Sequence, residues 1–169
     1  MARKFEEDTL LIATSNKGKV KEIEALLANY SLNLVCASQF NFEEPEENGK
    51  TFKENSEIKA KYYGKQTNLP ALADDSGLVI PKLNGQPGIY SARWAGKDKD
   101  FSVAMNRIKD TLFRENGGEY TIDDDAYFVC ALTIYWPHDD HYETFEGKLH
   151  GTLQFPPSGK NGLGYDPIF

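Results

Sequence analysis

Apolar residues in the first part of the chain follow two different periods. Short apolar runs at residues 10–13 and 32–37 are typical of buried strands. Between these runs the apolar residues recur mostly three positions apart, as on one face of a helix: Val20, Ile23, Leu26, Leu27 and Tyr30. The pattern therefore predicts a strand, a polar loop at residues 14–18, a helix and a second strand.

A second helix is predicted after the acidic loop at residues 41–50. Thr51 and Glu54 fit a capping box, which marks the start of a helix that we expect to run to about Gln66. The apolar residues expected on its inner face are Phe52, Ile58 and Tyr62.

The remaining pattern predicts a strand, a helix and a hairpin. The runs that predict strands are residues 69–73, 126–136, 142–147 and 149–153. We expect the polar residues 74–77 to break the first of these strands before residues 78–80 become extended again. A third helix carries Phe101, Met105, Ile108 and Leu112 on one face. Early strand–helix units with a later hairpin predict an α/β fold, with a mixed central sheet and flanking helices in one domain.

Composition narrows the class of protein. The chain has 169 residues and a net charge of −7, and this length fits one domain with its own core. We expect neither a membrane-spanning helix nor a signal peptide, because no sufficiently long apolar run is present. Cys36 and Cys130 lie in apolar runs and are typical of reduced cysteines in a cytoplasmic protein. The acidic balance argues against nucleic-acid and anionic-membrane partners, and it also argues against a polyphosphate ligand.

The polar loop between the first strand and helix is a candidate anion site. It contains Thr14, Ser15, Asn16, Lys17, Gly18 and Lys19. Backbone N–H groups at a helix N-terminus carry partial positive charge and favour phosphate groups. Lys19 would add a full charge and Gly18 would allow close approach of the backbone. The alternative is an ordinary capped turn with exposed lysines, and the loop lacks the P-loop pattern.

The second candidate site follows the apolar strand at residues 69–73. Asp74 and Asp75 come at its end, where α/β sheets commonly bind ligands. Adjacent strand residues face opposite sides, so only one of the two should point straight into a site. Glu46 and Glu47, in the loop before the second helix, would complete an oxygen-rich set that suits Mg²⁺, and Lys59 would reach a phosphate. The alternatives are a polar turn and a solvated lysine.

The third candidate site is the glycine-rich segment at residues 162–167. Its two glycines stand beside an aromatic residue and a carboxylate, which suits a loop that presents its backbone to a flat ligand. Tyr165 would stack on a base, and Asp166 would read the edge of that base. The alternative is a turn between strands.

Taken together and in this order, these segments resemble the inosine triphosphate pyrophosphatase family, the Ham1-like pyrophosphatases of non-canonical purine nucleoside triphosphates. The matching segments are residues 11–22, 46–56, 59–60, 69–78, 87–93 and 162–169. The resemblance therefore extends over residues 11–169.

This resemblance implies hydrolysis of ITP, dITP or XTP to the monophosphate and pyrophosphate, which removes deaminated purines from the nucleotide pool. It implies a cytoplasmic, homodimeric enzyme that depends on Mg²⁺, with Mn²⁺ as an alternative metal. The fold it implies is an elongated, two-lobed single domain with a central cleft.

The resemblance also implies roles for the acidic residues. Glu47 and Asp75 would carry the metal, with Asp74 close to it. Asp75 would in addition accept the proton of the attacking water. Such a site needs charge neutralisation and a well-placed water more than covalent help from the protein, which fits the residue types present.

For the substrate, the resemblance implies contacts from three parts of the chain. Residues 14–19 would hold the triphosphate, Lys59 would contact a phosphate and Ser76 the substrate. Leu163, Gly164, Tyr165 and Asp166 would meet the nucleoside. The family usually has an aromatic residue at the position of Leu163, and full loss of base stacking costs about 1–3 kcal/mol.

The family continues beyond the position of Phe169 with a Ser-His-Arg segment that recognises the 6-keto group of the purine. We therefore expect residues 1–169 to lack the C-terminal segment of the domain. The alternative hypothesis is a nucleotide-binding module or an inactive subunit. The missing segment and Leu163 favour that alternative, whereas Glu47 and Asp75 argue for an enzyme.

Overall fold

The computed structural model describes residues 2–119, 124–160 and 162–169. The strands in this part of the chain are β1 (Thr9–Ile12), β2 (Asn33–Cys36), β3 (Ala71–Val79), β4 (Asp125–Trp136) and β5 (His141–Thr152). The α-helices are α1 (Lys17–Leu27), α2 (Phe52–Thr67), α3 (Ser91–Trp94) and α4 (Phe101–Glu115). None of the helices in the described ranges is long and apolar enough to cross a membrane.

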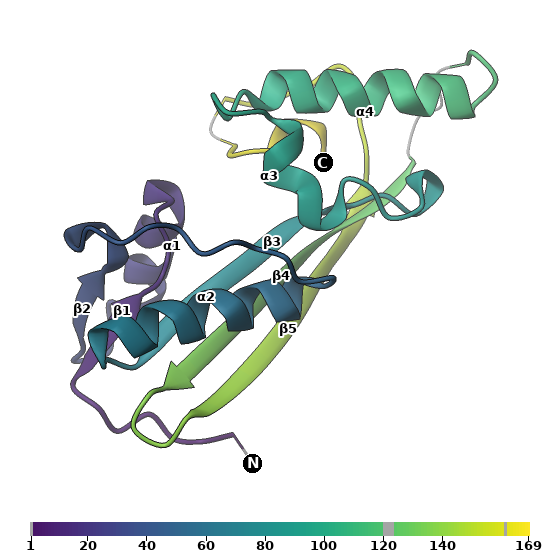
Figure 1. Cartoon of the computed structure of the whole chain (residues 1–169). Coiled ribbons are helices and arrows are strands. Elements are labelled where there is room, and N and C mark those ends of the chain that lie inside the picture. Colours follow the sequence, from purple (N-terminus) through teal and green to yellow (C-terminus); the bar gives the residue numbers. More distant parts are fainter. Residues whose placement is uncertain (1, 120–123, 161) are drawn as a thin grey trace. The chain divides into compact units, whose positions relative to one another are not determined.

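The strands form one mixed sheet in the order β2-β1-β3-β4-β5 (Figure 1). Strand β1 pairs in parallel with both neighbours, with Leu11 opposite Val35 of β2 and Ala71 of β3. A turn at residues 137–140 joins β4 to β5, so these two strands form an antiparallel hairpin. The predicted α/β class and mixed sheet are confirmed.

The chain divides into two compact units. The first comprises Met1–Asp75 and Ala131–Glu146, and the second comprises Ser76–Cys130 and Gly147–Phe169. Strands β3, β4 and β5 each contribute residues to both units.

The core of the first unit lies between α2 and one face of the sheet. Alternate strand residues share this face, and they pack with Ala60 and Tyr63 of α2; the strand residues are Leu11, Ala13, Ala71, Ala73 and Tyr135. Gly64 lets the helix approach the sheet closely, because a Cβ there would lie 2.6 Å from Cδ1 of Tyr135. The helix ends at Thr67, close to the predicted end, and its C-cap Asn68 adopts the left-handed conformation.

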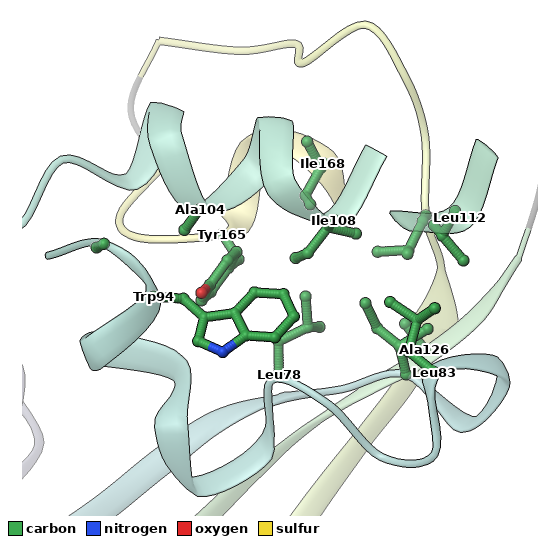
Figure 2. Close-up of a cluster of buried hydrophobic side chains, with 12 residues drawn as sticks. Leu78, Leu83, Trp94, Ala104, Ile108, Leu112, Ala126, Tyr165 and Ile168 are labelled. Atoms are coloured by element: carbon green, nitrogen blue, oxygen red, sulfur yellow. The ribbon is translucent and has the colours of Figure 1, made fainter. Parts of the chain in front are cut away.

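The second unit has a core of its own (Figure 2). Helix α4 contributes Ala104, Ile108 and Leu112, whose spacing of four residues puts them on one side of the helix. They pack with Trp94 of α3 and Leu78 of β3. The predicted inward face of this helix is confirmed, with Phe101 and Met105 partly buried at its edge.

Two details of the predicted elements are wrong. On α1 only Ile23 is buried, whereas Leu26 on the helix and Tyr30 beyond its end are 75% and 65% exposed, so the apolar spacing does not mark an inner face there. Strand β3 runs without a break through residues 74–77. The strand requires glycine at position 77, because a Cβ there would clash with the chain around Ser91. The Ser91 hydroxyl also accepts a hydrogen bond from the Leu78 N–H at 3.0 Å.

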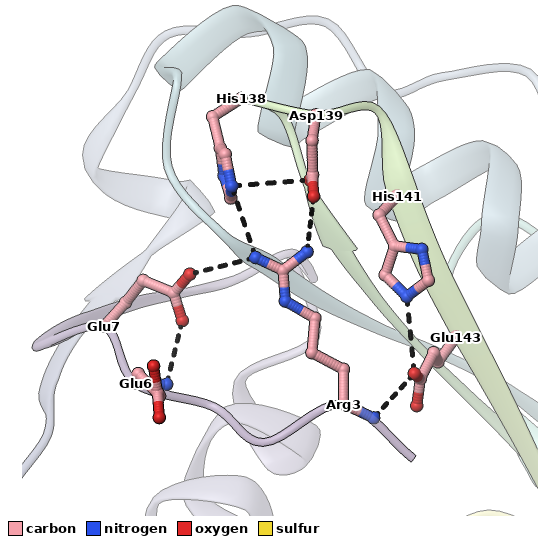
Figure 3. Close-up of polar contacts among 7 residues, drawn as sticks. All are labelled: Arg3, Glu6, Glu7, His138, Asp139, His141 and Glu143. Carbon is pink, nitrogen blue, oxygen red and sulfur yellow. Dashed lines mark hydrogen bonds and ion pairs between the residues drawn. The ribbon is translucent and has the colours of Figure 1, made fainter. Parts of the chain in front are cut away.

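The N-terminal segment is tied to the β4–β5 hairpin (Figure 3). The Arg3 guanidinium lies 4.4 Å from the ring centre of Trp136 and donates to Asp139 at 2.8 Å. The backbone N–H of Arg3 donates to Glu143 of β5 at 2.7 Å. These contacts lie within the first unit and hold the chain ahead of β1 against the hairpin.

Candidate active site

Strand alternation gives the two adjacent aspartates different partners. Asp75 is in phase with Ala71 and Ala73, so it lies on the face of β3 that α2 covers. Asp74 lies on the other face, where its Oδ2 is 3.8 Å from Nζ of Lys19. Both carboxylates are buried. The strand therefore separates two neighbouring acids, as its periodicity requires.

Helix α2 provides a cation for the acidic residues. The Lys59 Nζ lies 2.8 Å from Oε1 of Glu47 and 3.6 Å from Oδ1 of Asp75. Its side chain is mostly buried, so these contacts are shielded from water. Lys59 is thus an internal partner of two carboxylates rather than a solvated lysine.

The charges around Asp75 do not balance. Burial, opposed by the Lys59 ammonium and reinforced by Glu47 and Asp74, raises the pKa of the Asp75 carboxyl to about 6. Burial alone would lower the pKa of Lys59, but Asp75 and Glu47 outweigh it and raise that pKa. Burial therefore favours the neutral Asp75 carboxyl, whereas the neighbouring carboxylates favour the charged form of Lys59.

The loop before α1 is capped by its own side chains. Oδ1 of Asn16 accepts from the N–H groups of Gly18 and Lys19, at 2.9 and 3.4 Å. The Asn16 N–H donates to Oγ1 of Thr14 at 3.2 Å, and the Ser15 hydroxyl donates to Glu44. Lys17 is exposed. The structure therefore has the capped turn, with the lysines as its charged groups.

The glycine-rich segment lies in the second unit, as does Ser76. Gly164 adopts a φ of 62°, a left-handed conformation that favours glycine. Oδ2 of Asp166 accepts from the Leu163 N–H at 2.7 Å, and the Leu163 side chain is 52% exposed. Leu163 is therefore an accessible apolar residue on a turn fixed by Asp166.

Tyr165 differs from the expectation that its ring meets the base. Its side chain is only 3% exposed and lies in the core of the second unit (Figure 2). Its ring packs edge-on against Phe101 at 5.1 Å between centroids. Its hydroxyl donates to the carbonyl of Ser91 at 2.8 Å, and burial raises its pKa. The ring is part of the core because its size and committed hydroxyl suit an interior position.

One residue that contacts Asp75 was not among the site residues expected from the sequence. Asn55 is completely buried, and its Nδ2 donates to Oδ2 of Asp75 at 3.1 Å. It stands four positions before Lys59, so both project from the same side of α2. A polar residue on the inner side of a helix was the signal available in the sequence.

The predicted residues are thus divided between the units. Within the first unit, Lys59 contacts Glu47 and Asp75, and Lys19 contacts Asp74. The loop at residues 14–19 belongs to the same unit, whereas Ser76 and residues 163–166 belong to the second.

Comparison with known proteins gives consistent results. Residues 10–169 match the model of the Ham1 family. The dITP/XTP pyrophosphatase of Rhodospirillum centenum is 50% identical over 170 residues, which cover 99% of this chain and 80% of the relative. That of Agrobacterium fabrum is 46% identical, covering 99% of this chain and 78% of the relative. Among solved structures, a HAM1 protein from Coxiella burnetii superposes with a TM-score of 0.83 at 36% identity, covering 95% of this chain and 80% of that one.

Proposed function

We propose that this chain, which belongs to the Ham1 family, hydrolyses dITP, ITP and XTP to the nucleoside monophosphate and pyrophosphate. Relatives of similar sequence along almost the whole chain are named dITP/XTP pyrophosphatases. The structural observation that carries the proposal is the buried Asp75, contacted by Lys59 and Asn55 beside the carboxylate of Glu47. This arrangement supplies acids for a metal and a cation for phosphate.

The donor set fits Mg²⁺, with Mn²⁺ as the alternative. Glu47 and Asp75, which both lie against Lys59, offer the hard carboxylate oxygens that Mg²⁺ prefers, and Asp74 on the other face of β3 would add negative charge close by. When bound there, the metal would neutralise phosphate charge and orient a water. Lys59 would then share its positive charge between these carboxylates and a phosphate oxygen.

Asp75 is the proposed proton acceptor. A water oxygen forms a bond to the α-phosphorus, and its proton passes to a carboxylate oxygen of Asp75. The bond between the α-phosphorus and the bridging oxygen breaks, and pyrophosphate leaves with the electron pair. Asn55 and Lys59 contact opposite oxygens of Asp75 and so restrict its rotation.

Substrate contacts come from residues 14–19, Lys59, Ser76 and the turn at residues 163–166. Lys17 and Lys19 would attract the triphosphate, and the N–H groups of Gly18 and Lys19, which donate to Oδ1 of Asn16, lie at a helix N-terminus that favours phosphate. On the turn, exposed Leu163 offers apolar contact to the base, while the Tyr165 ring serves the core.

We also propose a homodimer in the cytoplasm. Leu26 and Tyr30 lie four residues apart and expose large apolar side chains, as interface residues do in the isolated subunit. The cytoplasmic location follows from the proposed substrates, since nucleoside triphosphates are made and used there. Light scattering of the purified chain tests the dimer.

A substrate panel tests the proposed activity. Pyrophosphate release should be rapid with dITP, ITP and XTP in the presence of Mg²⁺, and slow with dATP, GTP and pyrimidine triphosphates. A chelator should abolish it. Orthophosphate as the first product, or equal rates on all nucleotides, would contradict the proposed reaction or its specificity.

A further inference from the structure

We propose that Asn55 is a positioning residue for this reaction, which holds the carboxylate of Asp75 and the loop that carries Glu47 in one fixed arrangement. The inference rests on the proposed function, because it assigns Asn55 a role through Asp75. It concerns a residue that touches neither phosphate nor base in the contacts proposed above.

The two ends of the Asn55 carboxamide join different parts of the chain. Nδ2 donates to Oδ2 of Asp75 on β3 at 3.1 Å. Oδ1 accepts from the N–H of Gly49 at 2.9 Å, two residues after Glu47. One side chain of α2 therefore connects the strand that carries one acid to the loop that carries the other.

Only a carboxamide satisfies both contacts at once. The Gly49 N–H requires an acceptor, and the ionised Asp75 requires a donor, which also fixes the orientation of the amide. An apolar replacement would leave a buried N–H and a carboxylate oxygen without these bonds, and an aspartate would face Asp75 with like charge. Asn55 is completely buried, so water does not readily replace its contacts.

Gly49 provides a second, independent indication of this arrangement. A Cβ at Gly49 would lie 2.6 Å from Oδ1 of Asn55 and 2.8 Å from Cβ of Glu54. The backbone of the loop thus approaches the carboxamide more closely than any other residue type permits. The loop is packed onto Asn55 as well as bonded to it.

Asn55 and Lys59 contact different oxygens of the Asp75 carboxylate. Nδ2 of Asn55 contacts Oδ2, whereas Nζ of Lys59 lies 3.6 Å from Oδ1. The carboxylate therefore has a separate partner on each oxygen, and both partners project from α2. A mobile lysine cannot by itself set the plane of the carboxylate, but a short, buried carboxamide can.

The test compares Asn55→Ala with Ser56→Ala. Ser56 is the next residue of α2 and is also completely buried, with its hydroxyl hydrogen-bonded to Thr133 at 2.7 Å. S56A therefore also removes a buried hydrogen bond from α2, but at a residue that does not touch Asp75. We expect N55A to lower kcat for dITP by about 10–100-fold, with little change in KM. We expect S56A to lower Tm but keep the kcat of the unmodified chain.

A second readout does not depend on turnover. Electron paramagnetic resonance measures binding of Mn²⁺ alone, and N55A should bind it about 10–100-fold more weakly than S56A does. Equal kcat and equal Mn²⁺ affinity in N55A and S56A would overturn the proposal. Absence of pyrophosphate release by the unmodified chain would instead refute the proposed function, and Mn²⁺ binding would still decide the role of Asn55.

Asn55→Asp keeps the test valid if N55A fails to fold. It has the same shape and retains the acceptor for the Gly49 N–H, but it cannot donate to ionised Asp75. We expect N55D to lose kcat as N55A does. A folded N55D with unchanged kcat would contradict the proposal.

Discussion

The ammonium nitrogen of Lys59 lies 2.8 Å from Oε1 of Glu47. The same nitrogen lies 3.6 Å from Oδ1 of Asp75, and the lysine side chain is mostly buried. Lys59 thus offsets part of a negative charge that Asp74 increases further. The acidic net charge of the chain is compatible with a triphosphate substrate for this reason, because part of it is concentrated where a divalent cation would bind.

Replacement of this ammonium tests its role. Lys59→Met should raise KM for dITP, since a phosphate contact is lost. It should also lower the Tm of the metal-free protein, because removing one partner of a buried ion pair costs up to about 3–5 kcal/mol. Lys53→Met is the control, as Lys53 is exposed on the same helix. Equal KM and Tm in the two variants would place Lys59 outside the site.

Asp75→Asn should abolish turnover while leaving nucleotide binding largely intact. The amide retains the shape of the side chain but neither accepts the proton of the attacking water nor supplies a charged metal ligand. Steady-state pyrophosphate release and calorimetric binding of dITP measure the two effects. Asp98→Asn, in an exposed loop, is the control. Substantial residual kcat in D75N would count against Asp75 as the proton acceptor.

D75N should also change how the thermal stability of the protein depends on pH. Burial raises the pKa of Asp75 from 3.8 to about 6, so the folded state favours the protonated form. The stability gained from that form is present below about pH 4 and is lost as the pH rises through about 6. Asn mimics the protonated form at every pH. In a chelator, the Tm of D75N should therefore exceed that of the unmodified chain by an amount that grows from pH 5 to pH 7.

The size of this effect has an upper bound. The pKa shift corresponds to about 3 kcal/mol, which is up to about 10 °C in Tm for a chain of this length. Thermal melts at several pH values measure it. A Tm difference that stays constant between pH 5 and pH 7 would show that Asp75 does not titrate there.

Lys19→Ala should weaken binding of the triphosphate. Nζ of Lys19 lies 3.8 Å from Asp74 and 3.3 Å from Glu22, so the variant also removes a counter-charge from Asp74. We expect a higher KM for dITP with a smaller change in kcat. Lys21→Ala is the matched control, because Lys21 is exposed on the same helix. Identical kinetics in the two variants would place Lys19 on the solvated face.

Much of the fold was predictable because periodicity reports burial. The capping box placed the start of α2 correctly, with Thr51 accepting from the Glu54 N–H at 3.1 Å. Periodicity was misleading on α1 and just beyond its end, where apolar Leu26 and Tyr30 remain exposed. It also missed the continuity of β3, because the partners of the buried Asp74 and Asp75, such as Lys19, Lys59 and Asn55, are distant in the sequence.

The site was predictable in its acids and lysines but not in its supporting contacts. The pairing of Lys59 with Glu47 and Asp75 follows from tertiary packing, as does the contact of Asn55 with Asp75. Tyr165 has the aromatic ring of a ligand-stacking residue, yet its hydroxyl donates a hydrogen bond to the Ser91 carbonyl. Residue type identifies what a side chain can do, whereas only packing decides whether it is available.

Hydrolysis of dITP in water enriched in oxygen-18 tests the central claim most directly. Attack at the α-phosphorus predicts that the label enters the nucleoside monophosphate, with unlabelled pyrophosphate as the second product and no turnover by D75N. Label in pyrophosphate would show attack at the β-phosphorus. Absence of hydrolysis with Mg²⁺ or Mn²⁺ would contradict the account and favour a protein that binds nucleotides without cleaving them.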